Sequence, residues 1–146
     1  MRTRLFLAVL AAVLLAPGAS TAAQAPADEP FVVEYYYRVR WGHQEEFLAL
    51  FRKNHLPILE KERAMGRILE IRGVAPRYHA TEEGRWDYRV TIVFASVTAA
   101  FSPGLTDAEL RQLYPDQATF AKEEQRRFEL LESHWDVPLT TLSLRP

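Results

Sequence analysis

One histidine and four aromatic residues form the combination in this sequence with the clearest chemical potential. His55 lies two positions before Pro57, on or beside the apolar stripe of a predicted helix. The predicted strands that face this helix carry four aromatic residues: Tyr35, Tyr37, Trp86 and Tyr88. Because the ordinary pKa of imidazole lies near neutrality, a histidine between aromatic walls can position or deprotonate an acidic aromatic compound. We therefore predict His55 as a catalytic residue and the four aromatic residues as ligand contacts.

The same residues also fit a packed core. In that alternative, His55 only caps a helical turn that Pro57 has broken, and the aromatic rings fill the space between helix and sheet. A buried tyrosine or tryptophan must still place its OH or NH group, so a polar-lined cavity is expected even then. A cavity of about 300 Å³ or more that is lined by His55, Trp86 and a tyrosine would favour the ligand site, and solid packing would favour the core.

The remaining motifs exclude several kinds of chemistry. The chain has no cysteine, which excludes thiol redox chemistry. It has neither a G-x-S-x-G turn nor a glycine-rich phosphate loop, and it lacks HxH and HExxH spacings. We predict no cofactor and no metal, since a metal site would have to be assembled in three dimensions, for example from His79 and a carboxylate. His43 and His134 stand at the starts of predicted elements, where solvated histidines are common.

The elements that would position these residues follow from a change in hydrophobic period. The odd positions of residues 31–40 are apolar or aromatic, which is typical of a half-buried strand. Residues 43–65 then repeat apolar side chains at helical spacing and end at Gly66, which suits the left-handed position after a helix. Pro57 removes one backbone hydrogen bond of this helix, so we expect a kink or break at residues 54–56.

The rest of the chain predicts three more strands, at residues 67–74, 85–97 and 134–144. Leu69 and Ile71 are expected on the helix side of the first of these, and residues 99–105 are expected to form a loop. Pro138 suggests that the last strand lies at an edge of the sheet.

A second helical region is expected between the last two strands. Thr106 and Glu109 have the spacing of a capping box, which predicts a short helix there. Pro115 fits the first position of a further helix, which we predict over residues 116–133.

The even positions of the strands carry charged and polar residues that would lie on the opposite face of the sheet. We assign six of them to a dimer or partner surface: Glu34, Tyr36, Arg38, Arg72, Asp87 and Arg89. Charges of both signs on neighbouring strands can neutralise each other in cross-strand pairs. In a monomer this would be a solvated sheet face, whereas in a dimer each enclosed charge would need a partner or a ligand. We favour enclosure, because tyrosine and arginine are common at interfaces.

The predicted order is strand, helix, strand, strand, helix, strand, which is the arrangement of the ferredoxin-like α+β fold. Four antiparallel strands would carry two helices on one face. This order, the length and the opening YYYRVRWGHQEEFLALFRKNHLP resemble the dimeric α/β-barrel superfamily. The resemblance implies a homodimer whose sheets pair face to face. It also implies a small ligand in the cleft between sheet and helices, and some members of the superfamily are cofactor-independent oxygenases.

The N-terminus has the features of a secretory signal peptide. Arg2 and Arg4 precede an uncharged apolar run, and small residues follow it. This run of about a dozen residues is shorter than the roughly 20 needed to span a bilayer. We predict that the chain is exported, to the periplasm or as a secreted protein, and divides into a signal peptide (1–25), a linker (26–30) and one domain (31–146).

Cleavage would also set the charge of the exported domain. Removing Arg2 and Arg4 from the 18 basic residues leaves 16 against 19 acidic ones, a net charge of about −3. Such a domain has no basic surface to attract nucleic acid or anionic lipid, so we predict neither as a partner after cleavage.

Two functions fit these observations. The first is an exported homodimer that binds a small aromatic or apolar molecule, either as a binding protein or as a cofactor-independent, oxygenase-like enzyme. The second is a non-catalytic accessory or interaction domain of the cell envelope, whose charged sheet face is its partner surface. A fold alone does not choose between them, because function depends on the site.

Overall fold

The computed structural model describes residues 29–78 and 80–145, so the predicted signal peptide, most of the linker and His79 lie outside the described residues. Four antiparallel strands form one sheet in the order β2-β3-β1-β4. Their bounds are Phe31–Val39 (β1), Ile68–Val74 (β2), Tyr88–Phe94 (β3) and Leu131–Leu139 (β4). With β1 and β3 in the centre, this is the predicted ferredoxin-like topology, and Pro138 lies in an edge strand as expected.

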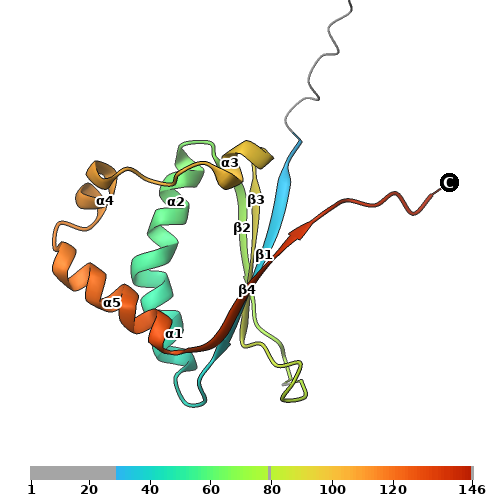
Figure 1. Ribbon diagram of the computed structural model, residues 1–146, viewed down its shortest axis with the longest axis horizontal. Coiled ribbons are helices and arrows are strands. Elements are labelled where there is room, and N and C mark those ends of the chain that lie inside the picture. Colours follow the sequence, from blue (N-terminus) through green and yellow to red (C-terminus); the bar gives the residue numbers. More distant parts are fainter. Residues whose placement is uncertain (1–28, 79, 146) are drawn as a thin grey trace, which may run out of the picture.

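Helices cover one face of this sheet and leave the other face bare (Figure 1). The first helical region follows β1 and consists of α1 (Gln44–Leu50), η1 (Phe51–His55) and α2 (Leu56–Ala64). The connection from β3 to β4 contains α3 (Val97–Phe101), α4 (Asp107–Leu113) and α5 (Gln117–Glu129). Within residues 29–78 and 80–145, none of the helices has the length and apolar character needed to cross a membrane.

The core lies between the sheet and the first helical region. Alternate residues of β1 face the helices, so Val33, Tyr37 and Val39 are buried. They belong to one cluster with buried apolar side chains from the other elements: Phe47, Phe51, Leu59, Ile68, Val90, Ile92, Phe94 and Leu130. This cluster fixes which side chains of β1 are presented to the helix layer.

Pro57 shapes the first helical region, although the helix does not break. Proline lacks the N–H group that an α-helix needs, and the five residues just before α2 form a π-helical turn instead. The N–H of Leu56 donates to the carbonyl of Phe51, five residues earlier. The expected irregularity is therefore confirmed as a wider turn, and His55 stands at its end, where it lines a cavity against the sheet.

A β-bulge changes the predicted faces of β2. The register with β3 shifts between Ile68 and Glu70, which leaves Leu69 as the extra residue. Ile68 is therefore the core residue and is 1% exposed, whereas Leu69 is 52% exposed. The prediction that Leu69 faces the helices is wrong, because strict alternation does not survive an inserted residue. Ile71 packs against the core as predicted.

Other boundaries differ from the predicted ones by a few residues. β3 begins at Tyr88, and α3 replaces part of the predicted loop. Asp116 caps α5 by accepting a hydrogen bond from a backbone N–H, which places Pro115 outside that helix. The capping box of Thr106 and Glu109 is present at the start of α4, as predicted.

Candidate functional site

A cavity of about 260 Å³ lies between the sheet, α2 and the segment around α3. Three of the residues predicted at the site, His55, Tyr35 and Tyr37, line it together. The remaining lining residues come from both layers: Leu59, Glu62, Arg67, Ile92, Phe94, Ala100, Ser102 and Gly104. We call this the His55 cavity.

His55 enters this cavity as a neutral imidazole. Burial, reinforced by the positive charge of Arg127, lowers the pKa of His55 to about 4. At neutral pH the ring therefore offers one nitrogen as a hydrogen-bond acceptor and the other as an N–H donor. The edge of the ring meets Phe51, with centroids 5.0 Å apart, and this contact limits its rotation. A ring with so low a pKa is a weak base in the free protein and is better suited to hydrogen bonding.

The two tyrosines of β1 contribute hydroxyl groups to the same cavity. Burial raises the pKa of Tyr35 to about 12 and raises the pKa of Tyr37 well above its usual range. Both hydroxyls therefore remain protonated and can donate a hydrogen bond. Among the described residues, no hydrogen-bond partner is found for either hydroxyl or for the ring of His55. Three hydrogen-bonding groups without a partner in the chain therefore meet at one cavity, where solvent or a ligand can pair with them.

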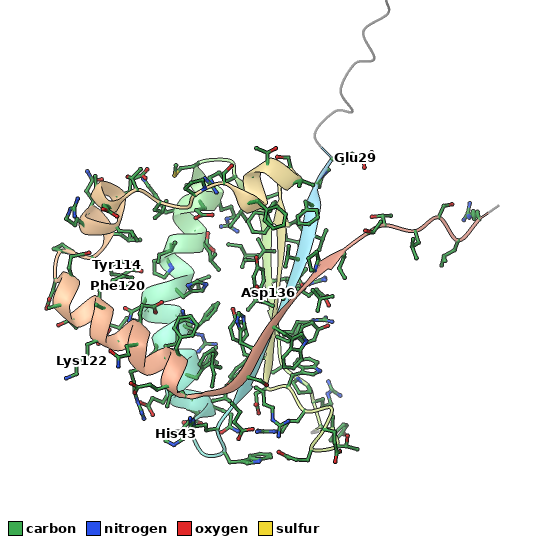
Figure 2. The ribbon with its side chains drawn as sticks, viewed as in Figure 1. Glu29, His43, Tyr114, Phe120, Lys122 and Asp136 are labelled. Carbon is green, nitrogen blue, oxygen red and sulfur yellow. The ribbon has the colours of Figure 1, made fainter. Side chains whose placement is uncertain are left out.

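Two further residues of β4, which were not predicted as site residues, lie beside the two tyrosines. His134 and Asp136 lie opposite Tyr37 and Tyr35 in the β1–β4 register, so they face the helices. Figure 2 shows Asp136 on this side of the strand. The His134 ring stacks on Tyr37 with centroids 4.5 Å apart, and its Nε2 lies 3.3 Å from an Asp136 carboxylate oxygen.

Burial lowers the pKa of His134, and the Asp136 carboxylate opposes that shift. The predicted start of β4 was wrong, because the strand begins at Leu131 and not at His134. His134 therefore lies in the middle of the strand, although the residue is solvent-exposed as predicted. The spacing of His134 and Asp136 by two residues, which puts them on one face of a strand, was the signal that could have revealed them.

Tyr88 lines a different cavity, of about 410 Å³, between the first helical region and strands β2 and β3. Its hydroxyl donates to the carbonyl of Gln44 at 3.0 Å, and its ring stacks on Phe47. Tyr37 lines both cavities. Tyr88 also lines a third, smaller hollow of about 210 Å³ together with Trp86. The residues predicted as one site are therefore spread over three cavities, and the one that contains His55 is slightly smaller than the 300 Å³ used as a criterion from the sequence.

Trp86 lies on the other face of the sheet, which corrects its predicted place in the helix-side cleft. Its ring meets the ring of Tyr36 edge to face, with centroids 5.7 Å apart, and Arg89 lies over it at 5.8 Å. The physical reason is that β3 starts only at Tyr88. The alternation of the strand does not extend back to residue 86.

The bare sheet face carries five of the six residues assigned to a partner surface: Glu34, Tyr36, Arg38, Arg72 and Arg89. Their charges are largely paired within the chain. Arg89 lies 3.3 Å from one carboxylate oxygen of Glu34, and the other oxygen accepts a 2.6 Å hydrogen bond from the Tyr36 hydroxyl. The ring of Tyr36 stacks on Trp135 with centroids 5.2 Å apart. The middle of the face is therefore amphipathic and nearly neutral.

Asp87 differs from the prediction for the partner surface. Its carboxylate accepts from the backbone N–H of Val39 at 2.8 Å and lies 3.3 Å from Arg85. These contacts hold the side chain at the end of the sheet, where β1 leads into α1. Asp87 precedes β3, and its carboxylate binds the backbone of Val39 at the end of β1. The side chain is therefore not available to a partner.

Metal binding has no support among residues 29–78 and 80–145, where no group of three or more histidine and acidic side chains could hold a metal ion. The alternative that involved His79 falls on a residue outside the described part of the chain.

Comparison with known proteins identifies the fold. No protein-family model and no curated protein matches the chain. Among solved structures, a dimeric ferredoxin-like protein from an uncultured marine organism is 6% identical and has a TM-score of 0.50, with 82% of this chain and 94% of that chain covered. A NIPSNAP family protein from Agrobacterium tumefaciens is 21% identical, with a TM-score of 0.45 and coverage of 81% and 98%. A candidate antibiotic biosynthesis monooxygenase from Bacteroides thetaiotaomicron is 14% identical, with a TM-score of 0.48 and coverage of 78% and 90%. Together with the strand order, the first of these likenesses identifies the chain as a ferredoxin-like α+β protein.

Proposed function

We propose that this protein is an exported homodimer that binds a small aromatic or apolar molecule with a hydroxyl or carbonyl oxygen in the His55 cavity. One observation carries the proposal. The His55 ring and the hydroxyls of Tyr35 and Tyr37 line one cavity, and they lack hydrogen-bond partners in the described part of the chain. These groups can both donate and accept hydrogen bonds, so a ligand oxygen within reach would pair with them in place of water.

The other walls of the cavity suit an aromatic ring. Leu59, Ile92 and Phe94 supply apolar surface from both layers. Glu62 and Arg67 also line the cavity, but their charged groups lie 3.8 Å apart and offset each other. A neutral or weakly acidic ligand therefore fits better than a strongly charged one.

Turnover would add one proton transfer to this binding mode. A phenolic hydroxyl that donates to His55 would pass its proton to the ring, while the hydroxyls of Tyr35 and Tyr37 stabilise the oxygen anion. Negative charge beside the ring raises its pKa, which makes the buried imidazole a stronger base in the complex than in the free protein. In an oxygenase-like reaction, dioxygen would then react with the electron-rich phenolate.

The homodimer would form through the bare sheet face. Trp135 and Leu139 are 39% and 41% exposed there, beside the paired charges of Glu34 and Arg89. A neutral, amphipathic face with exposed aromatic and aliphatic groups is suited to an interface. The marine protein with the same fold is also described as dimeric. Export rests on the N-terminal sequence pattern, which is that of a signal peptide.

The second candidate is a non-catalytic interaction domain of the cell envelope. The observation in its favour is the volume of the His55 cavity, about 260 Å³, which lies just under the usual range for ligand sites of roughly 300–1,000 Å³. In this reading the cavity holds only water, and the bare sheet face carries the function.

Calorimetric titration of the protein with a panel of simple phenols and aryl ketones distinguishes the two candidates. We expect saturable binding that falls by about tenfold in His55→Phe and in Tyr35→Phe, since each variant removes one hydrogen bond to the ligand. Tyr78→Phe is the matched control, because Tyr78 is 81% exposed and outside the cavity. Failure of the whole panel to bind would refute the ligand site and leave the interaction domain.

A further inference from the structure

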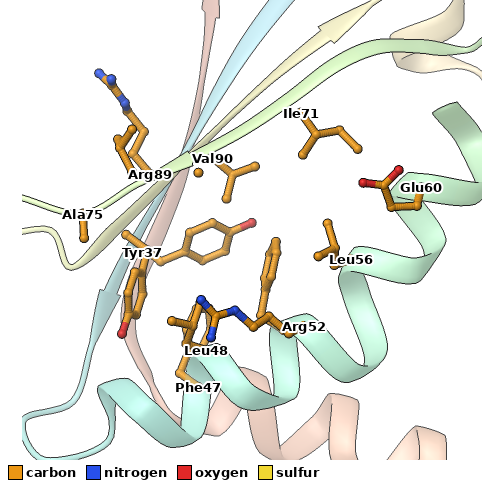
Figure 3. A pocket seen from close by; sticks show the side chains of 14 residues that line it. Tyr37, Phe47, Leu48, Arg52, Leu56, Glu60, Ile71, Ala75, Arg89 and Val90 are labelled. Carbon is orange, nitrogen blue, oxygen red and sulfur yellow. The ribbon is translucent and has the colours of Figure 1, made fainter.

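The largest of the three cavities has no role in the proposed function, although its volume of about 410 Å³ lies within the usual range for ligand sites. Figure 3 shows its walls, which the first helical region and strands β2 and β3 provide. Most of the wall is apolar, with Phe51 and Leu56 from the helices and Ile71 and Val90 from the strands. We call it the Gly73 cavity.

Gly73 makes room for this cavity. It lies inside β2 opposite Val90, on the helix side of the sheet, and its backbone is not in the left-handed region. A Cβ atom built on Gly73 would meet no heavy atom within 4 Å. Glycine weakens a strand interior and often marks a place where a ligand approaches the backbone. The missing side chain therefore leaves open space on the helix side of β2, which a larger residue at this position would partly fill.

Arg52 gives the cavity a net positive charge. Two charged side chains of the first helical region line it, Arg52 and Glu60. Glu60 is paired with Arg63 at 2.8 Å, whereas no ion pair of Arg52 is found in the described part of the chain. Figure 3 shows the Arg52 side chain beside Leu48 at the helix wall. The same view shows the guanidinium of Arg89 directed away from the cavity, so it does not compete for a ligand.

We propose that the Gly73 cavity binds an amphipathic organic anion, namely an aromatic or aliphatic carboxylate whose apolar body lies against Gly73 and whose carboxylate pairs with Arg52. An arginine guanidinium binds a carboxylate through charge-assisted hydrogen bonds, and the apolar walls account for the rest of the ligand. This is a second site, separate from the His55 cavity, and the two share Tyr37 as a common wall.

Calorimetric titration with 2-naphthoate, and with the neutral isostere 2-naphthamide, tests this site. We expect 2-naphthoate to bind at least tenfold more tightly than 2-naphthamide, since only the acid forms the charge-assisted pair. Arg52→Gln should remove this preference and leave the affinity for the amide unchanged. Arg111→Gln is the matched control, because it removes the same charge from an exposed position of α4 outside the cavity.

Filling the cavity gives a second, independent test. Gly73→Val adds a strand-forming side chain where there is free space, so we expect a folded protein with unchanged or higher thermal stability and at least a tenfold loss of affinity for both ligands. Gly73→Ala should give a smaller loss. His55→Phe should leave 2-naphthoate binding intact.

Three outcomes would overturn the inference: equal affinity for acid and amide, unchanged 2-naphthoate binding in folded Gly73→Val, or loss of binding in His55→Phe alone. The last outcome would place the ligand in the His55 cavity and support the proposed function. Phenol binding without 2-naphthoate binding would refute this inference while leaving the proposed function standing.

Discussion

At the scale of single residues, the environment of His55 decides what chemistry this protein can perform. The ring is largely buried beside Phe51 and under the influence of the Arg127 charge, and these surroundings keep it neutral. A neutral ring next to two protonated tyrosine hydroxyls forms a set of hydrogen-bonding groups rather than a charged site. In the proposed site, such a set would select ligands by where their oxygens lie, since hydrogen bonds depend on direction.

The burial of His55 makes stability depend on pH in a defined window. The ring has a pKa of about 4 in the folded protein and about 6.5 when unfolded, so between these values the unfolded chain binds more protons. Stability contributed by the neutral ring is complete above pH 6.5 and is lost as the pH falls toward 4. We expect a slope of up to about 1.4 kcal/mol per pH unit from this residue.

Urea unfolding at pH 7 and pH 4.5 measures this effect. The wild type should lose roughly 2 kcal/mol more than His55→Phe between the two pH values, because only the wild type carries the titrating ring. The acidic residues with lowered pKa values and His134 are present in both proteins. Their contributions to the pH dependence of the unfolding free energy therefore cancel when the wild type is compared with His55→Phe. Equal losses would show that His55 is not held neutral.

A second residue-scale prediction concerns the π-helical turn. The Tyr114 hydroxyl donates to the carbonyl of Asn54 at 2.6 Å, and the Asn54 side chain donates to Glu123 of α5 at 2.8 Å. Tyr114 stands beside Phe120 where α4 gives way to α5 (Figure 2). Tyr114→Phe should lower the free energy of unfolding by about 1 kcal/mol, since it removes this hydrogen bond between the two helical regions. Tyr78→Phe, at an exposed position, should have no effect in the same chemical denaturation experiment. Equal unfolding free energies for the two variants would argue against the hydrogen bond from Tyr114 to Asn54.

At the scale of the elements, a bulge in β4 and one buried arginine hold the end of the sheet. The β1–β4 register shifts so that Glu132 is the extra residue, and its carboxylate accepts from Arg38 at 2.7 Å and from Arg85 at 2.9 Å. The side chain of Arg85 is 2% exposed and lies 4.0 Å from the centre of the Trp41 ring. The Arg85 guanidinium thus connects its own segment to Trp41 and to Glu132, which are distant from it in sequence.

Arg85→Met should therefore destabilise the fold by about 2–4 kcal/mol, because it removes a buried partner of two carboxylates. Arg77→Met, which removes an exposed arginine from the same connection, should cost less than about 0.5 kcal/mol. Thermal unfolding of both variants provides the measurement. A loss below about 1 kcal/mol for Arg85→Met would show that the network is solvated and contributes little.

The sequence predicts most elements because periodicity survives wherever the pairing is regular. The alternation of β1 placed Tyr35 and Tyr37 on the helix side, where they line the cavity. The same rule of alternation failed in β2 at Leu69, where a bulge inserts a residue, and before β3 at Trp86, which precedes the paired strand. It also missed His134, because the start of β4 was placed three residues too late. Bulges and strand ends depend on pairing with distant segments, which local periodicity does not contain.

At the scale of the whole molecule, the bare sheet face is the feature that one chain leaves unexplained. Arg89 and Arg38 on this face are paired with Glu34 and Glu132, and Trp135 lies exposed over Tyr36 in its middle. Figure 1 shows β4 and the segment after it extending away from the helices. A second copy would cover this surface, since a self-complementary patch is what a two-fold dimer requires.

Light scattering measures the oligomeric state directly. The protein should have the mass of a dimer at micromolar concentration, and Trp135→Glu should convert it to a folded monomer by placing a charge at the centre of the interface. Lys122→Glu, at an exposed position of α5 on the helix side of the sheet (Figure 2), should remain dimeric. A monomeric wild type would contradict the enclosure of this face.

The central claim, that the His55 cavity holds a ligand oxygen, is tested most directly by nuclear magnetic resonance of the histidine side chains during titration with a phenol. The ring nitrogens of His55 should shift in a saturable way, whereas those of His43, which is exposed and pairs with Glu46, should not move. The shift should be weakened in Tyr35→Phe. No saturable shift of the His55 ring at millimolar phenol, or the same shift at His43, would contradict the account.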